Sequence, residues 1–570
     1  MSLVKAIIFT ILLGIKFSSA SLLHALEKDQ DLYYWQNEGW IKADRVSEDK
    51  IIELTFALKQ QNVKQLEDFL LQVSNPDSNL YGKYVSVEQL TRIIQPKDDS
   101  IEIVSLWLKQ NDVNDCELTL NKDFIRCTMK VKIAEKLLPG SNFYNFQHKK
   151  YSRNVVRSVS HYQVPNYIAE HIDFVGGLHR FPAVNFFKTK FENINYNRNH
   201  HISHSELFHI GVYPSVLRKR YNLTVDDVGS HPNNSQVVAQ FLEQYFNPND
   251  LSEFMSIFVG KDFPHKTLIE KVIGPDTGRS GVEASLDTQY IMGLGANITT
   301  WFWSTPGRHD NQEPFLTWLV DISNTSQVPW VHSVSYGEDE STLSEVYMNR
   351  VNIEFMKTGA RGLTILFASG DNGAGCQGNK FSPNFPVSSP YVTGVGGTAF
   401  KNPFGSGEET SYEISGGGFS NLFLQPSYQS ERVNEYLKSD NVPPEQYFNK
   451  SGRAYPDIAA LSNHFWIVNN RIPVPGVAGT SAATPTVAGI ISMLNEKRLQ
   501  NNKPPMGFIN PFLYKNPQAF FDILGGCNEG CLNTNDKGFC AEVGFDPVTG
   551  NGTPNYPELL KAAMNAVNKY

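Results

Sequence analysis

Residues 479–489 read GTSAATPTVAG, and this short stretch is more informative than any other part of the chain. A glycine that permits a tight turn precedes Ser481, and small residues then open an apolar helix predicted to run to about Leu499. The pattern places the Ser481 hydroxyl at a helix N-terminus, where free N–H groups and the helix dipole stabilise a developing oxyanion. Pro485 is expected in the first helical turn. Ser481 is therefore a candidate nucleophile; the alternative is an ordinary N-cap.

A serine nucleophile needs a base. The run around Ser481 resembles the nucleophile segment of subtilisin-like proteases. In those proteases the base is a histidine in a separate motif, where Gly, Thr and a second His follow it. None of the histidines beyond residue 207 has this context; they are His209, His231, His265, His309, His332 and His464. The sequence therefore indicates either an inactive relative of those proteases or a different base.

Acidic residues are the candidates for that base. Glu283 and Asp287, in GVEASLD (281–287), are four residues apart, so in a helix they share one face. Their neighbours are mostly apolar, and two acids in such surroundings repel each other while burial raises at least one pKa. The alternative is an exposed acidic helix face. A third carboxylate, Asp371, lies in SGDNGAG (369–375), directly after an apolar run that predicts a strand.

The nucleophile segment, the E-x-x-x-D pair and S-G-D after a strand form the signature set of the sedolisin (serine-carboxyl peptidase) family, which this chain resembles. Longer segments carry the same resemblance: GRSGVEASLDTQY, ILFASGDNGAGC, PNFPVSSPYVTGVGGTAF, ISGGGFSN, GRAYPDIAALS and GFDPVTGNGTPN. The resemblance covers essentially everything after residue 207 and, more loosely, the region before it. It implies four roles: Ser481 as nucleophile, Glu283 as general base, Asp287 orienting Glu283 and sharing its proton, and Asp371 in the oxyanion hole.

The activity that the resemblance implies is release of tripeptides from the free N-termini of peptides and proteins. Carboxylates with ordinary pKa values of about 4 suit general-base work at low pH, and Asp371 donates a hydrogen bond only when it is protonated. An acidic, lysosome-like compartment is therefore expected. Two alternatives are a family endopeptidase with an open cleft and a secreted non-catalytic glycoprotein. The net charge of −8 argues against nucleic acid as a partner.

The resemblance also implies one structural calcium ion near the C-terminus. The matching residues are Asp522 and Asp546 by their side chains and Ile523, Glu542 and Gly544 by their backbone carbonyls. Oxygen ligands of this kind suit Ca²⁺. A glycine is usual where Glu542 stands, and a carbonyl ligand survives the change only if the backbone can adopt the same angles.

Residues 1–20 read as a signal peptide. Lys5 is followed by the apolar run 6–15, and small residues precede a predicted cut after Ala20. The alternative is a membrane anchor, but Lys16 leaves the run short of the ~20 residues that span a bilayer. No later segment is long and apolar enough to span, so no membrane span is expected in the mature protein.

An Asn-, His- and Lys-rich stretch at 186–207 reads as an exposed linker between two parts of the chain. Residues 208–570 alternate short apolar runs with helical patterns, which predicts a parallel sheet flanked by helices; the resemblance makes this part a subtilisin-like catalytic domain. Residues 21–185 are expected, by resemblance, to form an inhibitory prosegment with a ferredoxin-like α/β fold. Self-cleavage near Leu207 is expected on acidification. The histidines at 200, 201 and 204 favour a solvated loop over a metal site.

Six cysteines and six N-x-S/T sequons agree with export. Cys116 and Cys127 are close in sequence and are expected to pair. Cys376 is then the one remaining partner for the cluster at 527, 531 and 540. The alternative for the cluster is zinc. The resemblance implies the pairs Cys376–Cys531 and Cys527–Cys540. The sequons all follow residue 206: Asn222, Asn233, Asn297, Asn324, Asn449 and Asn551.

Overall fold

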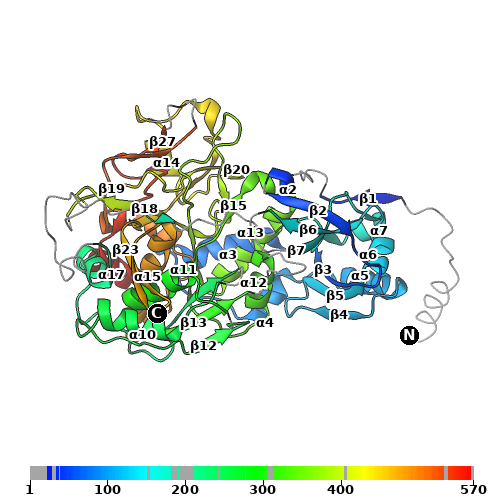
Figure 1. The fold of residues 1–570 in the computed structure, drawn as a ribbon, viewed down its shortest axis with the longest axis horizontal. Helices are drawn as coiled ribbons and strands as arrows, with labels where there is room; N and C mark the ends of the chain where they lie inside the picture. The colour runs from blue at the N-terminus through cyan, green and yellow to red at the C-terminus, as the bar shows by residue number, and fades with distance from the viewer. Residues whose placement is uncertain are drawn as a thin grey trace.

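The structure is a computed structural model with two folded units (Figure 1). The N-terminal unit ends at residue 181, and the C-terminal unit begins at residue 211. The described residues are 22–27, 34–37, 39–149, 154–181, 190–191, 211–241, 244–276, 278–305, 314–402, 407–531, 534 and 537–566. The predicted signal peptide, the histidines at 200, 201 and 204 and the cleavage position near Leu207 lie outside them.

The C-terminal unit is built on a sheet with the strand order β12-β13-β11-β14-β16-β18-β19, and β22 also pairs with β18. All of these pairs are parallel except β18 with β19. The strands are β11 (Ser235–Gln240), β12 (Lys271–Ile273), β13 (Thr299–Ser304), β14 (Val331–Val334), β16 (Thr364–Ala368), β18 (Thr393–Phe400), β19 (Glu409–Ser411) and β22 (Ile458–Leu461). The central strands are nearly continuous apolar runs because both faces of the sheet are covered.

Helices cover both faces of this sheet. Val238 of β11 belongs to the core formed with α11 and α15, whereas its neighbours Val237 and Ala239 belong to the core formed with α12 and α13. This alternation follows from the two-residue period of a strand. The helices are α11 (Val282–Leu294), α12 (Pro314–Ser323), α13 (Glu345–Ala360) and α15 (Thr480–Gln500). The predicted helix-flanked parallel sheet is confirmed.

Helix α15 is buried along nearly its whole length. It begins after Gly479, whose φ of 144° is a value that residues with a Cβ rarely adopt. Pro485 lies in the second turn, not in the first as expected, because the helix already begins at Thr480. The proline has no N–H, so the Ser481 carbonyl lacks the donor that an α-helix normally supplies.

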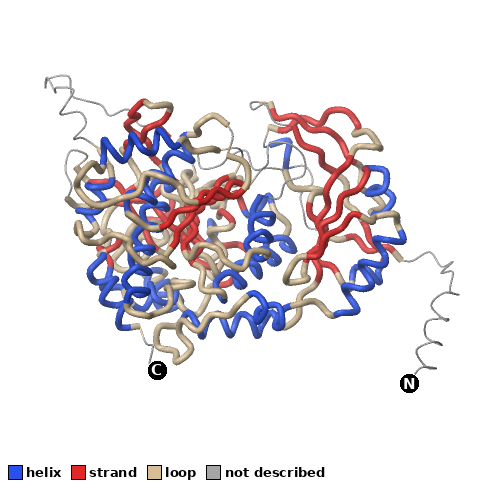
Figure 2. The backbone as a smooth tube through the Cα atoms, turned by 90° about the horizontal axis from the view of Figure 1, so that it is seen from below, coloured by secondary structure: helices blue, strands red, loops and turns tan. Residues whose placement is uncertain are grey.

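The N-terminal unit contains an antiparallel sheet in the order β4-β5-β3-β9. In chain order its elements are β3 (Ile51–Leu58), α3 (Val63–Ser74), α4 (Val87–Ile94), α5 (Asp98–Gln110), β4 (Asp115–Leu118), β5 (Phe124–Lys130), α6 (Val131–Leu137), α7 (Asn166–Ala169) and β9 (Ile172–Gly176). The first and third strands are central, with helices after each, and this is the expected ferredoxin-like order. Figure 2 shows these strands as a group separate from the central sheet.

Shorter elements complete both units. In the N-terminal unit they are β1 (Leu23–Ala25), α2 (Tyr34–Asn37), β2 (Trp40–Arg45), β6 (Phe143–His148), β7 (Asn154–Ser158) and β8 (Gln163–Pro165). Between the units lies β10 (Lys190–Phe191). In the C-terminal unit they are α9 (Pro214–Arg220), α10 (Pro248–Phe258), β15 (Glu338–Asp339), η1 (Glu340–Thr342), β17 (Asn384–Phe385), β20 (Gly418–Leu424), α14 (Ser430–Tyr436), η2 (Glu445–Tyr447), β21 (Gly452–Tyr455), β23 (Phe465–Asn469), β24 (Ile472–Ala478), α16 (Asn510–Lys515), η3 (Pro517–Ala519), β25 (Phe520–Phe521), β26 (Cys527–Glu529), β27 (Lys537–Cys540), β28 (Thr553–Pro554) and α17 (Tyr556–Asn565).

All six cysteines form disulfides: Cys116–Cys127, Cys376–Cys531 and Cys527–Cys540. The expected pairing is confirmed. The alternative prediction of a zinc site at Cys527, Cys531 and Cys540 is wrong, because each of these sulfurs is bonded to another sulfur. Among the helices that the structure describes, none is long and apolar enough to cross a membrane.

The sequon at Asn551 differs from an accessible glycosylation site. Its side chain is buried, and its amide donates to the Asp457 carbonyl at 2.9 Å. Attachment of a glycan would break this bond and expose the turn, so Asn551 is unsuitable for glycosylation in the folded chain.

Candidate active site

Polar side chains from several strands gather at the carboxyl end of the central sheet. Gln240 is the last residue of β11, Ser335 directly follows β14, and Ser369 directly follows β16. The carboxyl ends of parallel strands share one edge of the sheet, which is where open α/β folds bind ligands. Hydrogen bonds link this edge to Asp287 and to the turn that precedes Ser481.

Ser481 is the second residue of α15 and is fully buried. Its hydroxyl has no hydrogen-bond partner among the residues that the structure describes. Buried hydroxyl groups normally have such a partner. The position at the start of a long helix is the predicted one, and the N–H groups of the first turn point toward this end of the helix.

Asp371 lies against the same turn. Its Oδ1 accepts the Thr480 N–H at 2.7 Å and the Thr480 hydroxyl at 3.0 Å. A Cβ added to Gly479 would stand 2.8 Å from Asp371 Oδ2, so only glycine leaves room for the carboxyl group here. The loop after β16 and the turn before α15, 109 residues apart in sequence, thus form one unit.

Asp287 is fully buried on the face of α11 toward the sheet edge. Its Oδ2 accepts the Gln240 amide at 2.5 Å, and its Oδ1 accepts the Ser335 hydroxyl at 2.7 Å. Burial, and then the negative charge of Glu283, raise the pKa of Asp287 well above its usual value, while the two donors oppose that rise. These surroundings favour a proton shared near Asp287.

Glu283 lies one helical turn before Asp287, in the first turn of α11. Its side chain is 8% exposed, and that of Asp287 is fully buried. An exposed acidic helix face, the alternative that the sequence left open, is therefore wrong. Helix α11 packs directly on α15, the helix that carries Ser481, so the sequence-predicted acids and serine lie on two adjoining helices.

Sequence reasoning missed the residues that hold these acids. Gln240, Ser335 and Thr480 donate to Asp287 and Asp371, and the Tyr336 hydroxyl donates to Gln240 Oε1 at 2.7 Å. The available signal was a polar residue that ends or follows a buried apolar strand. That signal is common, and it does not say which carboxylate the residue meets.

A disulfide-bonded hairpin supports the loop that carries Asp371. Cys376–Cys531 ties the end of this loop to the hairpin β26–β27, which Cys527–Cys540 closes. The Ala374 N–H donates to the Glu529 carbonyl at 2.8 Å. Buried Asn528 donates to the Ser415 carbonyl at 3.0 Å and accepts the Phe539 N–H at 2.7 Å. The hairpin thus fixes two loops at the candidate site.

The predicted calcium residues lie in one C-terminal loop region. Asp546 is fully buried, and its hydrogen-bond donors among the described residues are uncharged: the N–H groups of Glu542, Val548 and Thr549 and the Thr549 hydroxyl. Burial raises its pKa to about 7. Asp522 Oδ2 accepts the Gly544 N–H at 2.9 Å. Two carboxylates therefore flank the 542–544 segment, and a hard cation would offset the buried charge.

Glu542, where glycine is usual, keeps its carboxylate away from this turn. Its Oε1 accepts a hydrogen bond from the Asn441 amide on a neighbouring loop. The substitution therefore does not by itself fill the space between Asp522 and Asp546. Among the described residues, no group of three or more His, Cys, Asp or Glu forms a metal cluster, but the predicted set needs only two such side chains.

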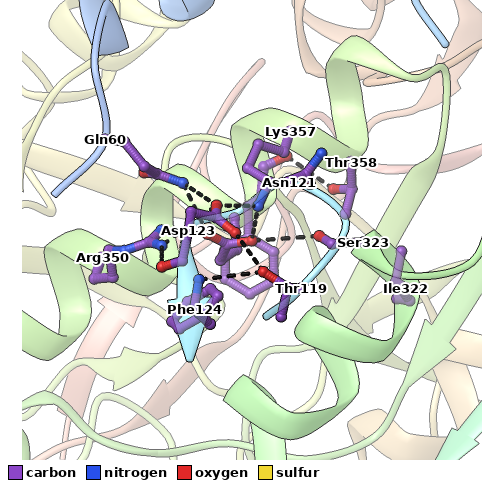
Figure 3. Close-up of polar contacts among 12 residues, drawn as sticks. Gln60, Thr119, Asn121, Asp123, Phe124, Ile322, Ser323, Arg350, Lys357 and Thr358 are labelled. Atoms are coloured by element: carbon purple, nitrogen blue, oxygen red, sulfur yellow. Dashed lines mark hydrogen bonds and ion pairs between the residues drawn. The ribbon is translucent and has the colours of Figure 1, made fainter. Parts of the chain in front are cut away.

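The N-terminal unit is anchored to the C-terminal unit by a buried charge network (Figure 3). Asp123 of the N-terminal unit accepts from Lys357 at 2.7 Å and lies 3.4 Å from the Arg350 guanidinium. Both cations belong to α13 and also pair with Glu354. All four side chains are buried. The interface thus contains a specific charged contact on α13, which covers the face of the sheet opposite α15.

A second contact lies next to the candidate nucleophile. Strand β10 pairs antiparallel with β24, placing Lys190 opposite Ala478 and Phe191 opposite Val477. Ala478 is three residues before Ser481. The segment between the two units therefore covers the edge of the strand that leads into the nucleophile turn.

Known proteins resemble this chain along nearly its whole length. The family described as "Pro-kumamolisin, activation domain" matches residues 38–181. Tripeptidyl-peptidase 1 of Rattus norvegicus is 50% identical over 552 residues, 95% of this chain and 96% of that protein. Tripeptidyl-peptidase 1 of Homo sapiens is 49% identical over 537 residues, 92% of this chain and 94% of that protein. The N-terminal unit is therefore an activation domain.

Among solved structures, Pseudomonas sedolisin (serine-carboxyl proteinase) complexed with two molecules of pseudo-iodotyrostatin is 22% identical and covers 62% of this chain and 97% of its own, with a TM-score of 0.49. Half of the positions are identical between this chain and rat tripeptidyl-peptidase 1 over nearly the full length of both. Because the chain also carries an activation domain, the protein is a protease made as a zymogen. The chain belongs to the tripeptidyl-peptidase 1 family.

Proposed function

We propose that this protease is an acid exopeptidase of the lysosome that releases tripeptides from the free N-termini of polypeptides. Ser481, Glu283, Asp287 and Asp371 would carry the chemistry. The observation that supports this most is the pair of buried acids on α11, packed against the helix that begins with a buried serine hydroxyl. The names of the relatives supply the tripeptide specificity, and the acid requirement follows from the carboxyl groups.

In the proposed mechanism, Ser481 Oγ attacks the scissile carbonyl carbon while Glu283 accepts the hydroxyl proton. Asp287 shares that proton and orients Glu283. The oxyanion of the tetrahedral intermediate accepts hydrogen bonds from the protonated carboxyl group of Asp371 and from backbone N–H groups at the start of α15. Glu283 then protonates the leaving amine as the C–N bond breaks. Water next attacks the acyl carbon of the Ser481 ester while Glu283 accepts a proton from it, and Glu283 returns this proton to Ser481 Oγ as the C–O bond breaks and the tripeptide leaves.

Acidic conditions serve two groups at once. Asp371 donates to an oxyanion only as the neutral acid. The raised pKa of Asp287 keeps a proton on the buried pair as the pH rises above the usual range of an aspartic acid. Activity should therefore be confined to low pH and fall toward neutrality, as the chemistry of a lysosomal enzyme requires.

For the chain organisation we propose a signal peptide at 1–20, an inhibitory prosegment at 21–185, a linker at 186–207 and a catalytic domain at 208–570, with self-cleavage near Leu207. The pairing of β10 with β24 supports a linker that lies near the active site before cleavage. A structural Ca²⁺ would be held by Asp522 and Asp546 with the carbonyls of Ile523, Glu542 and Gly544. It would neutralise two carboxylates and cross-link the loop.

The test compares hydrolysis of an Ala-Ala-Phe-reporter peptide with its N-acetylated form, at about pH 4.5 and about pH 7. Acid-favoured release from the free peptide only, lost in Ser481→Ala and strongly reduced in Glu283→Gln and Asp287→Asn, is the expected result. Cleavage of both peptides would indicate an endopeptidase instead. No cleavage by fully processed protein would mean that the chain is not catalytic.

Self-cleavage has its own readout. Purified Ser481→Ala precursor should stay full-length at about pH 4.5, where the wild-type precursor shortens by its prosegment. Normal shortening of the pure variant would contradict self-processing, because no other nucleophile is proposed.

A further inference from the structure

The side chain of Thr480, the residue before the proposed nucleophile, is joined to a different loop of the chain. It is fully buried, and its hydroxyl lies 3.0 Å from Asp371 Oδ1, 3.1 Å from the Gly370 carbonyl oxygen and 3.1 Å from the Gly370 N–H nitrogen. It accepts from the Gly370 N–H and has one hydrogen to donate, to either oxygen. The Thr480 N–H adds a second donor to Asp371 Oδ1 at 2.7 Å.

Other threonines of the same helix behave differently. The hydroxyls of Thr484 and Thr486 donate to the carbonyls of Thr480 and Ala482, four residues back in each case, at 2.9 Å. Those bonds are the usual ones of a threonine inside a helix. The Thr480 hydroxyl, by contrast, bonds across 109 and 110 residues of sequence to the loop that carries Asp371.

The contacts distinguish the two oxygens of Asp371. Oδ1 faces the Thr480 N–H and hydroxyl, so a proton on Oδ1 would oppose a hydrogen-bond donor. Oδ2 lies beside Gly479, where the absent Cβ leaves room. In this orientation of the carboxyl group, a neutral Asp371 carries its proton on Oδ2.

We infer that Thr480 is a positioning residue, which fixes the rotation of the Asp371 carboxyl group so that the Oδ2 proton is presented to the oxyanion. This inference rests on the proposed function, in which Asp371 belongs to the oxyanion hole. Thr480 itself does not touch the reacting atoms; it acts through Asp371. The backbone N–H would retain part of the restraint if the hydroxyl were removed.

The experiment uses Thr480→Val, which keeps the shape and removes the hydroxyl, Thr480→Ser, which keeps the hydroxyl, and Thr486→Val as the matched control in the same helix. Each precursor is processed at acid pH, checked for complete shortening, and assayed on the Ala-Ala-Phe-reporter peptide. We expect Thr480→Val to lower kcat about tenfold or more, with KM within about twofold. Thr480→Ser should retain most of kcat, and Thr486→Val should match the wild type.

Two further measurements separate positioning from a general loss of structure. Without the hydroxyl donor the neutral form of Asp371 is favoured, so the alkaline limb of the kcat profile should move to higher pH in Thr480→Val. In an Asp371→Ala background, which removes the carboxyl group, Thr480→Val should cause little additional loss, because the two changes act through one group.

Each failure has a distinct meaning. Equal loss in Thr480→Val and Thr486→Val, equal loss in Thr480→Val and Thr480→Ser, or full additivity with Asp371→Ala would overturn the positioning role. Full activity of Asp371→Ala alone would instead remove Asp371 from the oxyanion hole, and the proposed function would fail at that residue.

Discussion

Glu340 is a buried acid outside the proposed catalytic residues, and it bears on how the folded chain responds to pH. Its carboxyl group accepts the Ser420 hydroxyl at 2.6 Å and the Asn421 N–H at 2.9 Å. Burial outweighs these donors and raises the pKa of Glu340 from its ordinary value of 4.5 to about 7. Between these two values the folded chain binds more protons than the unfolded chain. The free energy of unfolding therefore falls as pH rises from about 4.5 to about 7.

We predict that Glu340→Gln weakens this pH dependence. The raised pKa corresponds to up to about 3 kcal/mol of stability lost toward neutral pH, and a neutral glutamine removes that component. Thermal unfolding midpoints at about pH 5 and about pH 7.5 are compared in a Ser481→Ala background, which keeps the chain uncut. The difference between the unfolding midpoints at the two pH values should be smaller in the variant than in the parent protein. An unchanged gap would mean that Glu340 does not titrate in this range.

At the scale of elements, the sequence predicted those features whose signals are local. Ser481 follows a glycine and opens an apolar helix, Glu283 and Asp287 share a helical face, and Asp371 follows an apolar run. The partners of these residues come from strands that are distant in sequence, so no local pattern selects them. Gln240 and Ser335 are ordinary polar residues until the sheet order places β11 beside β14.

The boundaries were less predictable than the elements. Pro485 was assigned to the first turn because proline favours that position. The helix begins earlier, since the glycine turn and the bonds between Thr480 and Asp371 fix its start. Tertiary contacts therefore overrode a local preference at the start of this helix. The helix-flanked parallel sheet and the ferredoxin-like prosegment, by contrast, could be predicted from the family resemblance and the order of apolar runs alone.

The hairpin β26–β27 leads to a prediction about Asn528. Replacing Asn528 by alanine removes the donor to Ser415 and the acceptor for Phe539, both in buried surroundings. We expect a loss of about 2 kcal/mol in the free energy of unfolding and a lower kcat, because the Asp371 loop rests on this hairpin. Urea unfolding of the Ser481→Ala precursor and steady-state kinetics of the processed enzyme measure the two effects.

Asn501→Ala is the matched control for this hairpin prediction. Its amide donates to the Lys497 carbonyl at 2.8 Å on an exposed helix end, far in sequence from the Asp371 loop. That change should cost well under 1 kcal/mol and leave kcat unaltered. If Asn528→Ala behaves no differently from Asn501→Ala, the hairpin does not support the active-site loop.

For the whole molecule, the question is which contacts would hold the prosegment in place at the acid pH of the proposed self-cleavage. Lys357 and Arg350 lower the pKa of Asp123 to about 2, even though burial alone, the largest effect on it, would raise it. A lowered pKa stabilises the folded state above the ordinary value of 3.8, and that stability is lost only as pH falls toward about 2. At about pH 4.5 Asp123 therefore stays ionised, and acid alone does not break this contact.

We accordingly predict that Asp123→Asn accelerates activation. It leaves Lys357 and Arg350 buried with one fewer negative charge, and breaking such a buried pair costs about 3–5 kcal/mol. The Ser481→Ala precursor carrying it should unfold at a lower temperature, and the catalytically competent precursor should shorten faster at about pH 4.5 on a gel time course. Asp49→Asn is the matched control, since Asp49 also meets two lysines, Lys130 at 3.0 Å and Lys132 at 3.1 Å, but on the surface.

The control should behave as the wild type because exposed ion pairs contribute little. If Asp123→Asn and Asp49→Asn process at the same rate, the buried network does not limit release, and the step that responds to acid lies elsewhere along the prosegment or in the cleavage itself. If Asp123→Asn is faster and Asp49→Asn is not, the prosegment is held in acid by a charge pair that acid does not titrate. Opening of the anchor on α13 would then come before cleavage of the linker, because loosening the anchor speeds the cut.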